Sequence, residues 1–142
     1  MFPKEESKKL RQEFWTAFGK SFPRKWLLYN TKLKGVSFKF HFDTSSALIA
    51  LDLEDDLEKR IAYWEKLQSL KSILLKDYLP NAIFEEAYIL ANGKEISRIY
   101  LPLDSKVSIH NKNTWREVME FFNGHMTLFE AFFNDHKEII EI

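Results

Sequence analysis

The chain has 142 residues, with 21 basic residues, 21 acidic residues and no cysteine. This length suits one domain that spans residues 1–142, and the lack of cysteine excludes disulfides, thiolate metal sites and cysteine nucleophiles. No apolar run approaches the roughly 20 residues that a membrane span needs, and the N-terminal segment lacks the apolar stretch of a secretory signal. We therefore expect a soluble, cytoplasmic protein with no membrane partner.

The charge is balanced overall but unevenly distributed along the chain. Residues 1–39 contain ten basic and three acidic residues, a balance of +7, whereas residues 40–142 contain 11 basic and 18 acidic residues, a balance of −7. Such asymmetry is typical of a segment that faces nucleic acid. The alternative is that the basic segment packs beside Asp52, Glu54 and Asp55 of its own chain.

The first predicted element is a helix over residues 4–19. Gly19 is a plausible C-terminal stop, and Pro23 prevents the helix from continuing. An apolar stripe at spacings of three and four supports the helix: Leu10, Phe14, Ala17 and Phe18.

Residues 20–35 show no period and are predicted to form a connector. Cations and aromatic residues alternate in it, which favours nucleic-acid binding, because cations track phosphates while aromatic faces stack on bases. In the alternative interpretation, Trp26, Leu27 and Leu28 pin the connector to the core. The candidate binding residues are Arg24, Lys25, Trp26, Tyr29, Lys32 and Lys34.

Val36 to Glu54 alternate cleanly between apolar and polar residues, which predicts an antiparallel hairpin. Pairing Phe42 with Ala47 leaves residues 43–46 as the loop and makes the two apolar faces coincide. We expect three phenylalanines of this hairpin to be buried against a long helix that follows it: Phe38, Phe40 and Phe42.

Ile83 to Leu103 form a second predicted hairpin, which we expect in the middle of the sheet. Asn92-Gly93 is typical of a two-residue type I′ turn, which would pair Ala91 with Lys94 and Glu85 with Tyr100. The better core face in that register carries Phe84, Tyr88, Leu90, Ile99 and Leu101.

Helices are predicted between and after the hairpins. The long helix, residues 55–79, begins at Asp55 or Asp56 as its cap. After the second hairpin we expect a short extra strand at Val107 and Ile109, and then two helices separated by a stop at Asn123-Gly124. A capping box of Thr127 and Glu130 would start the last helix. The buried stripe of the long helix is Leu57, Ile61, Trp64, Leu67, Leu70 and Leu74.

The predicted fold class is therefore α+β. The elements follow the order α-β-β-α-β-β-(β)-α-α, with one mostly antiparallel sheet built from two hairpins and helices packed on it.

One short motif would fit a metal-dependent nuclease. Asp104 and Lys106 have Asp-x-Lys spacing, and Asp52 and Glu54 supply further carboxylates for a metal ion that activates water. Matches of three residues arise freely by chance, however, and the histidines show no ligand spacing. Neither a nucleophile elbow nor a glycine-rich phosphate loop is present. The sequence therefore indicates no metal site and no cofactor.

Arg98 is the most notable single polar residue, because it lies in the middle of a strand, where an arginine costs free energy unless it is paired or functional. We include it among the candidate binding residues. The alternative is an ion pair with Glu85, its diagonal neighbour on the paired strand.

The chain resembles a bacterial family, a domain of unknown function, at four stretches: Arg11–Gly19, Tyr29–Lys32, Asn92–Tyr100 and Asn111–Trp115. None of them is a catalytic signature. The resemblance implies a link to DNA-processing or defence systems, because larger members carry this domain behind restriction-nuclease-like segments. A chain of this length leaves no room for such a nuclease. We expect a non-enzymatic accessory or binding module with a nucleic-acid or protein partner; the alternative is a divergent metal-dependent nuclease.

Overall fold

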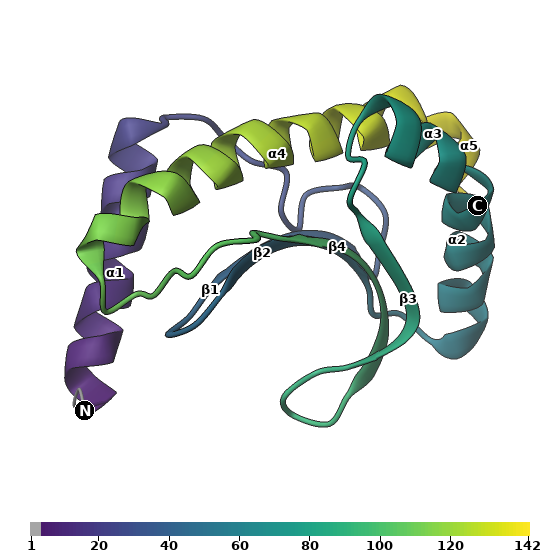
Figure 1. Cartoon of the computed structure of the whole chain (residues 1–142). Coiled ribbons are helices and arrows are strands. Elements are labelled where there is room, and N and C mark those ends of the chain that lie inside the picture. Colours follow the sequence, from purple (N-terminus) through teal and green to yellow (C-terminus); the bar gives the residue numbers. More distant parts are fainter. Residues whose placement is uncertain (1–3) are drawn as a thin grey trace.

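The computed structural model describes residues 4–142, and it confirms the predicted α+β class. Its helices and strands form one sheet with helices packed on it (Figure 1). The elements are α1 (Lys4–Ser21), β1 (Val36–Phe42), β2 (Ala47–Leu53), α2 (Leu57–Ser69), α3 (Lys71–Asp77), β3 (Ile83–Ile89), β4 (Glu95–Pro102), a 3-10 helix (Lys112–Thr114), α4 (Trp115–Asp135) and α5 (Lys137–Ile140).

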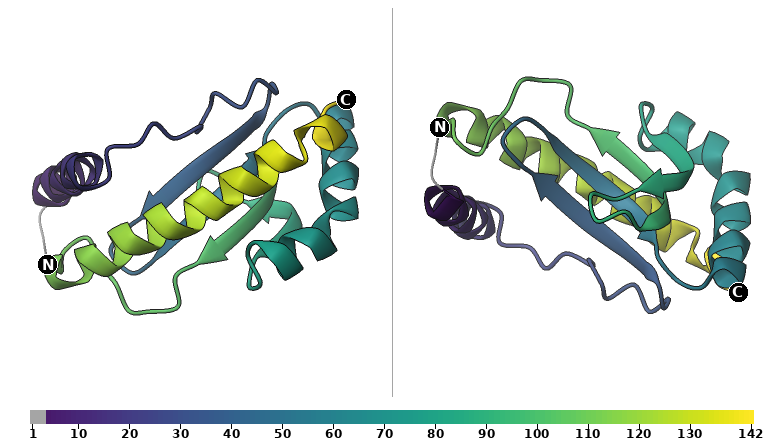
Figure 2. Two further views of the ribbon diagram at one scale, coloured as in Figure 1. Left: turned by 90° about the horizontal axis from the view of Figure 1, so that it is seen from above. Right: turned by 90° about the horizontal axis from the view of Figure 1, so that it is seen from below.

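The sheet is antiparallel, and its four strands follow the order β1-β2-β4-β3. The second hairpin therefore does not lie in the middle as a unit, because β4 is central while β3 forms an edge. The sheet curves into an arch, with α4 along its convex face and the β3–β4 hairpin curling below it (Figure 1). Within residues 4–142, no helix covers the concave face, which is seen from below in Figure 2.

The β1–β2 register is the predicted one. Phe42 pairs with Ala47 and Phe38 pairs with Leu51, so the apolar side chains of both strands share one face. The loop is closed by Asp43, whose Oδ1 accepts hydrogen bonds from the backbone N–H groups of Ser45 and Ser46. Alternation alone therefore predicted this pairing correctly.

The β3–β4 register differs from the prediction. Glu85 pairs with Arg98 rather than Tyr100, and an irregularity lies between Glu85 and Tyr88. The cause is the turn, which is longer than two residues: Leu90 donates its N–H to the Lys94 carbonyl, and Gly93 (φ +86°) donates to the Leu90 carbonyl.

The irregularity also changes the face on which Tyr88 lies. Tyr88 pairs with Ile96, and its ring centroid lies 4.4 Å from the guanidinium carbon of Arg98. Tyr88 therefore belongs to the concave face and not to the core with Ile99, as the predicted register would have it.

The hydrophobic core lies between the convex face and two helices, α4 and α1. Phe38 packs edge-on against Phe129 and Phe133 of α4, at ring-centroid distances of 5.2 and 5.5 Å. Phe42 packs against Phe14 of α1 at 4.7 Å. The expectation that the long helix covers these phenylalanines is therefore wrong, because α4 and α1 occupy that position.

The predicted long helix is two helices, α2 and α3, which break at Leu70. Ser69 donates its hydroxyl to the Lys66 carbonyl, a local bond that competes with helix geometry, and Leu70 closes the turn onto Leu67. The start is as predicted, since the side chain of Asp56 accepts from the Lys59 N–H.

The apolar stripe predicted for the long helix, now divided between α2 and α3, is only partly buried. Trp64, Leu67, Leu70 and Leu74 are buried, whereas Leu57 is 59% exposed and Ile61 is 41% exposed. The first turns of α2 therefore lie beyond the edge of the core.

The predicted stop at Asn123-Gly124 is also wrong, because α4 runs through it without interruption. A glycine costs about 1 kcal/mol in a helix interior, and a continuous buried stripe outweighs that cost: Val118, Phe122, Met126, Phe129 and Phe133. Thr127 and Glu130 consequently form no capping box.

The extra strand predicted after β4 is absent from the described chain. Val107 and Ile109 are buried in a loop, which is tied to the first hairpin where Ile109 donates its N–H to the Asp43 carbonyl. No helix within residues 4–142 has the length and apolarity to cross a membrane.

The packing predicts that replacing Phe38 and replacing Phe40 by alanine destabilise the fold to different extents. Phe38→Ala should lower the free energy of unfolding by about 3–5 kcal/mol, because a fully buried ring leaves a large cavity. Phe40→Ala should cost clearly less, since Phe40 is only half-buried. Chemical denaturation of both variants measures this, and equal losses would contradict the assigned packing.

Candidate functional site

The connector between α1 and β1 is clamped onto α4 by one buried carboxylate. Glu130 is 2% exposed, and its two oxygens accept from Arg24 Nη2 at 2.9 Å and from the Leu27 N–H at 2.7 Å. Arg24 Nη1 also donates to Thr127 Oγ1 at 2.7 Å. The sequence did not predict this clamp, because the spacing of Thr127 and Glu130 fits a helix cap equally well.

The clamp also fixes Trp26. Its ring stacks on Phe18 with centroids 6.3 Å apart, and it meets Phe40 edge-on at 5.4 Å. The guanidinium of Arg24 lies 4.5 Å from the centre of the Trp26 ring. Trp26 and Arg24 therefore hold the connector to the core, as the alternative interpretation of this segment expected.

The middle of the connector is a tight turn that presents Tyr29 to solvent. Asn30 donates its N–H to the Leu27 carbonyl, and Phe38 of β1 donates to the Leu28 carbonyl. Leu28 has a positive φ of 47°, which is strained for a residue with a side chain. Tyr29 is 76% exposed and forms no hydrogen bond within the described chain.

The far end of the connector is fixed by a close approach to the residues after β2. Gly35 has a φ of +79°, and a Cβ atom on it would lie 2.5 Å from Asp55 Cβ. The Gly35 carbonyl accepts from the Glu54 N–H at 2.8 Å. The acidic segment predicted to face the connector therefore does lie beside it.

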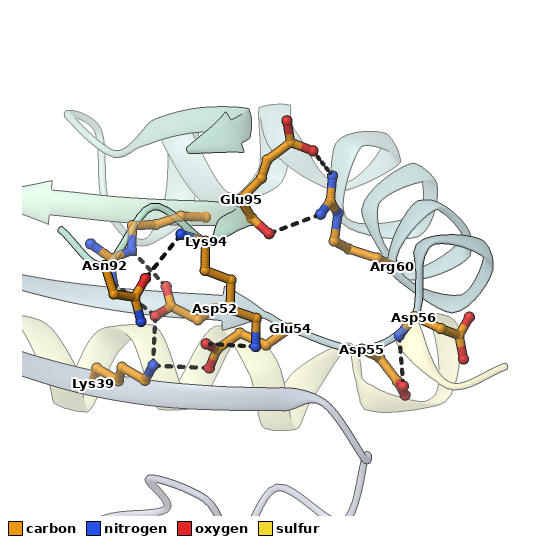
Figure 3. Close-up of polar contacts among 10 residues, drawn as sticks. Lys39, Asp52, Glu54, Asp55, Asp56, Arg60, Asn92, Lys94 and Glu95 are labelled. Atoms are coloured by element: carbon orange, nitrogen blue, oxygen red, sulfur yellow. Dashed lines mark hydrogen bonds and ion pairs between the residues drawn. The ribbon is translucent and has the colours of Figure 1, made fainter. Parts of the chain in front are cut away.

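Lys32 and Lys34 do not pair with that acidic segment. Instead, Lys39 forms ion pairs with two of these carboxylates: its Nζ lies 3.2 Å from Asp52 Oδ2 and 2.9 Å from Glu54 Oε2 (Figure 3). Within residues 4–142, eight exposed cations of α1 and the connector form no ion pair. We call them the basic strip: Lys4, Lys8, Lys9, Arg11, Lys20, Lys25, Lys32 and Lys34.

The basic strip follows the outer side of α1 and the edge of the sheet. Figure 2 shows the connector running beside β1, from α1 at one end of the strand to the other end. Lys8, Arg11 and Trp15 follow one another on α1 at spacings of three and four and line one shallow hollow. Trp15 was not among the predicted site residues, although this spacing could have revealed it.

The concave face carries a separate cluster of charges around Asp52. Asp52 is 0% exposed and accepts two hydrogen bonds from Arg98, from Nε at 2.7 Å and from Nη2 at 2.9 Å. Burial opposes the charged form of Arg98, but the hydrogen bonds and the charge of Asp52 raise the pKa of Arg98 above its ordinary value. Arg98 is thus an ion-pair residue, and its partner is Asp52.

The predicted partner of Arg98, Glu85, is occupied elsewhere. Glu85 lies opposite Arg98 in the register, but its carboxylate accepts the hydroxyl of Tyr100. Burial and this hydrogen bond raise the pKa of Tyr100 to about 12. The tyrosine therefore remains a neutral donor at physiological pH.

Lys39 and Lys94 complete the charge cluster. Burial would lower the pKa of Lys39, but its contacts with Glu54 and Asp52 raise it above the ordinary value. Lys94 Nζ lies 3.8 Å from Glu54 Oε1 (Figure 3). Each buried charge has a partner of opposite sign, so this cluster ties β1, β2 and β4 together.

A pocket of about 510 Å³ lies beside the cluster, between the two hairpins. His41 on its wall bonds through Nε2 to Asp43 Oδ2 at 2.8 Å. Partial burial would raise the pKa of Asp43, but hydrogen bonds from the Ser45 N–H, His41 and the Ser46 N–H lower it to about 2. His41 and Asp43 of this pocket are therefore paired with each other, and Arg98 is paired with Asp52 beside it.

The carboxylates suggested for a nuclease do not come together. The Leu103 N–H bonds to the Ala47 carbonyl, so Asp104 lies near the start of β2. Asp52 and Glu54 lie at the other end of that strand, about 20 Å away at roughly 3.3 Å per residue. Residues 4–142 contain no group of three or more histidine or carboxylate side chains that could hold a metal ion.

The Asp52 cluster predicts strong coupling between two variants. Asp52→Leu should lower the free energy of unfolding by about 3–5 kcal/mol, because it leaves the buried Arg98 without its carboxylate. Arg98→Met should lower it by less, because Lys39 still contacts Asp52. The double variant should lose less than the sum, since it removes both charges. Chemical denaturation of the three variants tests this, and additive losses would show that the pair does not act as a unit.

The low pKa of Asp43 predicts that the stability of the fold decreases at acidic pH. Its folded pKa of about 2 lies below its ordinary value of 3.8, so the carboxylate stabilises the fold above pH 4 and loses this effect as the pH falls toward 2. In Asp43→Asn, the melting temperature should fall less between pH 5 and pH 2 than in the unmodified protein. Parallel pH profiles would refute the assignment.

Comparison with known proteins identifies one family. No curated protein and no solved structure matches the chain. The family described as Domain of unknown function (DUF4268) matches residues 10–137, which extend from α1 to the start of α5. The match includes the connector, the whole sheet and α4. The chain therefore belongs to the DUF4268 family.

Proposed function

We propose that this domain is a non-enzymatic accessory module that binds nucleic acid through the basic strip. The observation that carries the proposal is the set of eight exposed cations on α1 and the connector that form no ion pair within residues 4–142. Of the acidic residues on α1, Glu13 is paired with Lys112, which leaves Glu5 and Glu6. The strip is therefore strongly positive despite the zero net charge of the chain.

Unpaired cations bind phosphates more favourably than cations that already have a carboxylate partner. A lysine that neutralises a phosphate releases a condensed counterion, and this release drives association at low salt. A lysine already held by a carboxylate, as Lys39 is, would first have to give up that partner. The proposal accordingly excludes Lys39, Arg24 and Arg98 from the contact surface.

The proposal includes no catalytic step, because Asp104 lies far along β2 from Asp52 and Glu54. Its biological setting follows the resemblance to domains found behind restriction-nuclease-like segments. In that setting a module without its own chemistry would hold DNA or RNA for another protein.

Salt dependence tests the proposal. Lys32→Asn combined with Lys34→Ala should reduce the slope of log affinity against log salt by about two, one for each lost phosphate contact. Asn replaces Lys32 because that residue has a φ of 68°, which asparagine tolerates better than alanine. Fluorescence anisotropy with a labelled oligonucleotide measures the slope.

The matched control removes the same charge from the opposite side of the sheet. Lys76 on α3 and Lys106 after β4 are exposed and form no ion pair within the described chain. Lys76→Ala with Lys106→Ala should leave the slope unchanged. Equal slopes in the two double variants, or no binding by the unmodified protein at about 50 mM salt, would overturn the proposal.

A further inference from the structure

An aromatic depression of about 300 Å³ lies at the edge of β1, between α1 and the turn of the connector. It is the place where the edge of the sheet, the helix and the turn meet. Its walls come from three consecutive parts of the chain, α1, the connector and β1: Trp15, Leu28, Tyr29, Phe38, Lys39 and Phe40.

The depression adjoins the basic strip through Trp15. This residue lines both the aromatic depression and the neighbouring hollow that contains Lys8 and Arg11. The orientation of the Trp15 ring is fixed by α4, because the ring stacks on Phe122 with centroids 5.7 Å apart and planes within 4°. One rigid ring therefore separates an aromatic surface from a cationic one.

Tyr29 forms the opposite wall and is held outward by the turn rather than by side-chain contacts. The left-handed backbone of Leu28 and the bond from Phe38 to the Leu28 carbonyl fix the direction of the turn. An exposed ring next to a strained residue points to a role outside the fold, because the core gains nothing from the orientation of that ring.

We infer that this depression receives an unpaired base, so that the nucleic acid bound by the basic strip is single-stranded. The inference rests on the proposed function. Surfaces that bind single strands combine cations that follow the backbone with aromatic rings on which bases stack. Here cations lie on both sides of the rings, Lys8 and Arg11 on α1, and Lys32 and Lys34 on the connector.

A duplex could use the cations but not the depression. Its bases are paired and stacked on one another, so it presents phosphates and groove edges to the protein rather than free base faces. A single strand can turn one base into the depression while the neighbouring phosphates contact the strip. The chain should therefore prefer single strands, and Tyr29 should contribute to that preference.

The test compares Tyr29→Ala with Tyr29→Phe, which keeps the ring. Tyr29→Ala should weaken binding of a labelled single-stranded oligothymidylate by roughly 5- to 150-fold, the range that stacking on one aromatic ring contributes. Tyr29→Phe should bind nearly as well as the unmodified protein. Binding of a duplex of the same length should be unchanged in both variants, because neither loses a cation.

Two further readouts separate stacking from a change in the fold. Tyr29 is exposed and its side chain forms no hydrogen bond within residues 4–142, so Tyr29→Ala should keep the melting temperature and the salt slope. The indole N–H resonance of Trp15 should shift more on adding the single strand than on adding the duplex, because only the single strand places a base in the depression.

The outcomes distinguish this inference from the proposed function. Salt-dependent binding of single strand and duplex with equal affinity, or a single-strand affinity that Tyr29→Ala leaves unchanged, would overturn the stacking inference and leave the basic strip as a phosphate-binding surface. Absence of binding to both nucleic acids at low salt would overturn both.

Discussion

The packing of α4 across the convex face of the sheet is the interaction on which the rest of the structure depends. Phe129 and Phe133 enclose Phe38 from α4, and Phe122 supports Trp15 and Phe40 near the other end. Because α4 also carries Glu130, the same helix that closes the core fixes the path of the connector. The position of Tyr29 and of the connector lysines is thus a consequence of how α4 lies on the sheet.

Charged side chains are arranged differently on the concave face and at the β1 edge of the sheet. On the concave face Asp52 is fully buried and is compensated by Arg98 and Lys39, so that face offers few free charges. A buried cluster of this kind adds little net stability, but its paired charges favour the observed arrangement of strands. At the β1 edge the cations have no carboxylate partners within the described chain, so they stay available to phosphates.

The sequence allowed the parts that depend on local alternation to be predicted. Phe38, Phe40 and Phe42 alternate with polar residues, so their register with β2 followed directly. The β3–β4 register did not follow, because Asn92-Gly93 suited a two-residue turn while the chain forms a longer one. The helix stop predicted at Asn123-Gly124 was also wrong, because the long buried stripe of α4 outweighs one residue of poor helix propensity.

The candidate site was predictable only in its charge, because its geometry depends on contacts between distant segments. The +7 balance marked the region that carries the basic strip. No local feature of the sequence distinguishes Trp26, which packs against the core, from Tyr29, which is exposed to solvent. The distinction arises from Glu130, more than a hundred residues away, which draws Arg24 and Leu27 onto α4. With those residues held, the turn at Leu28 exposes Tyr29. The positive φ of Leu28 is the local cost of placing this ring beside cations that have no carboxylate partner within residues 4–142.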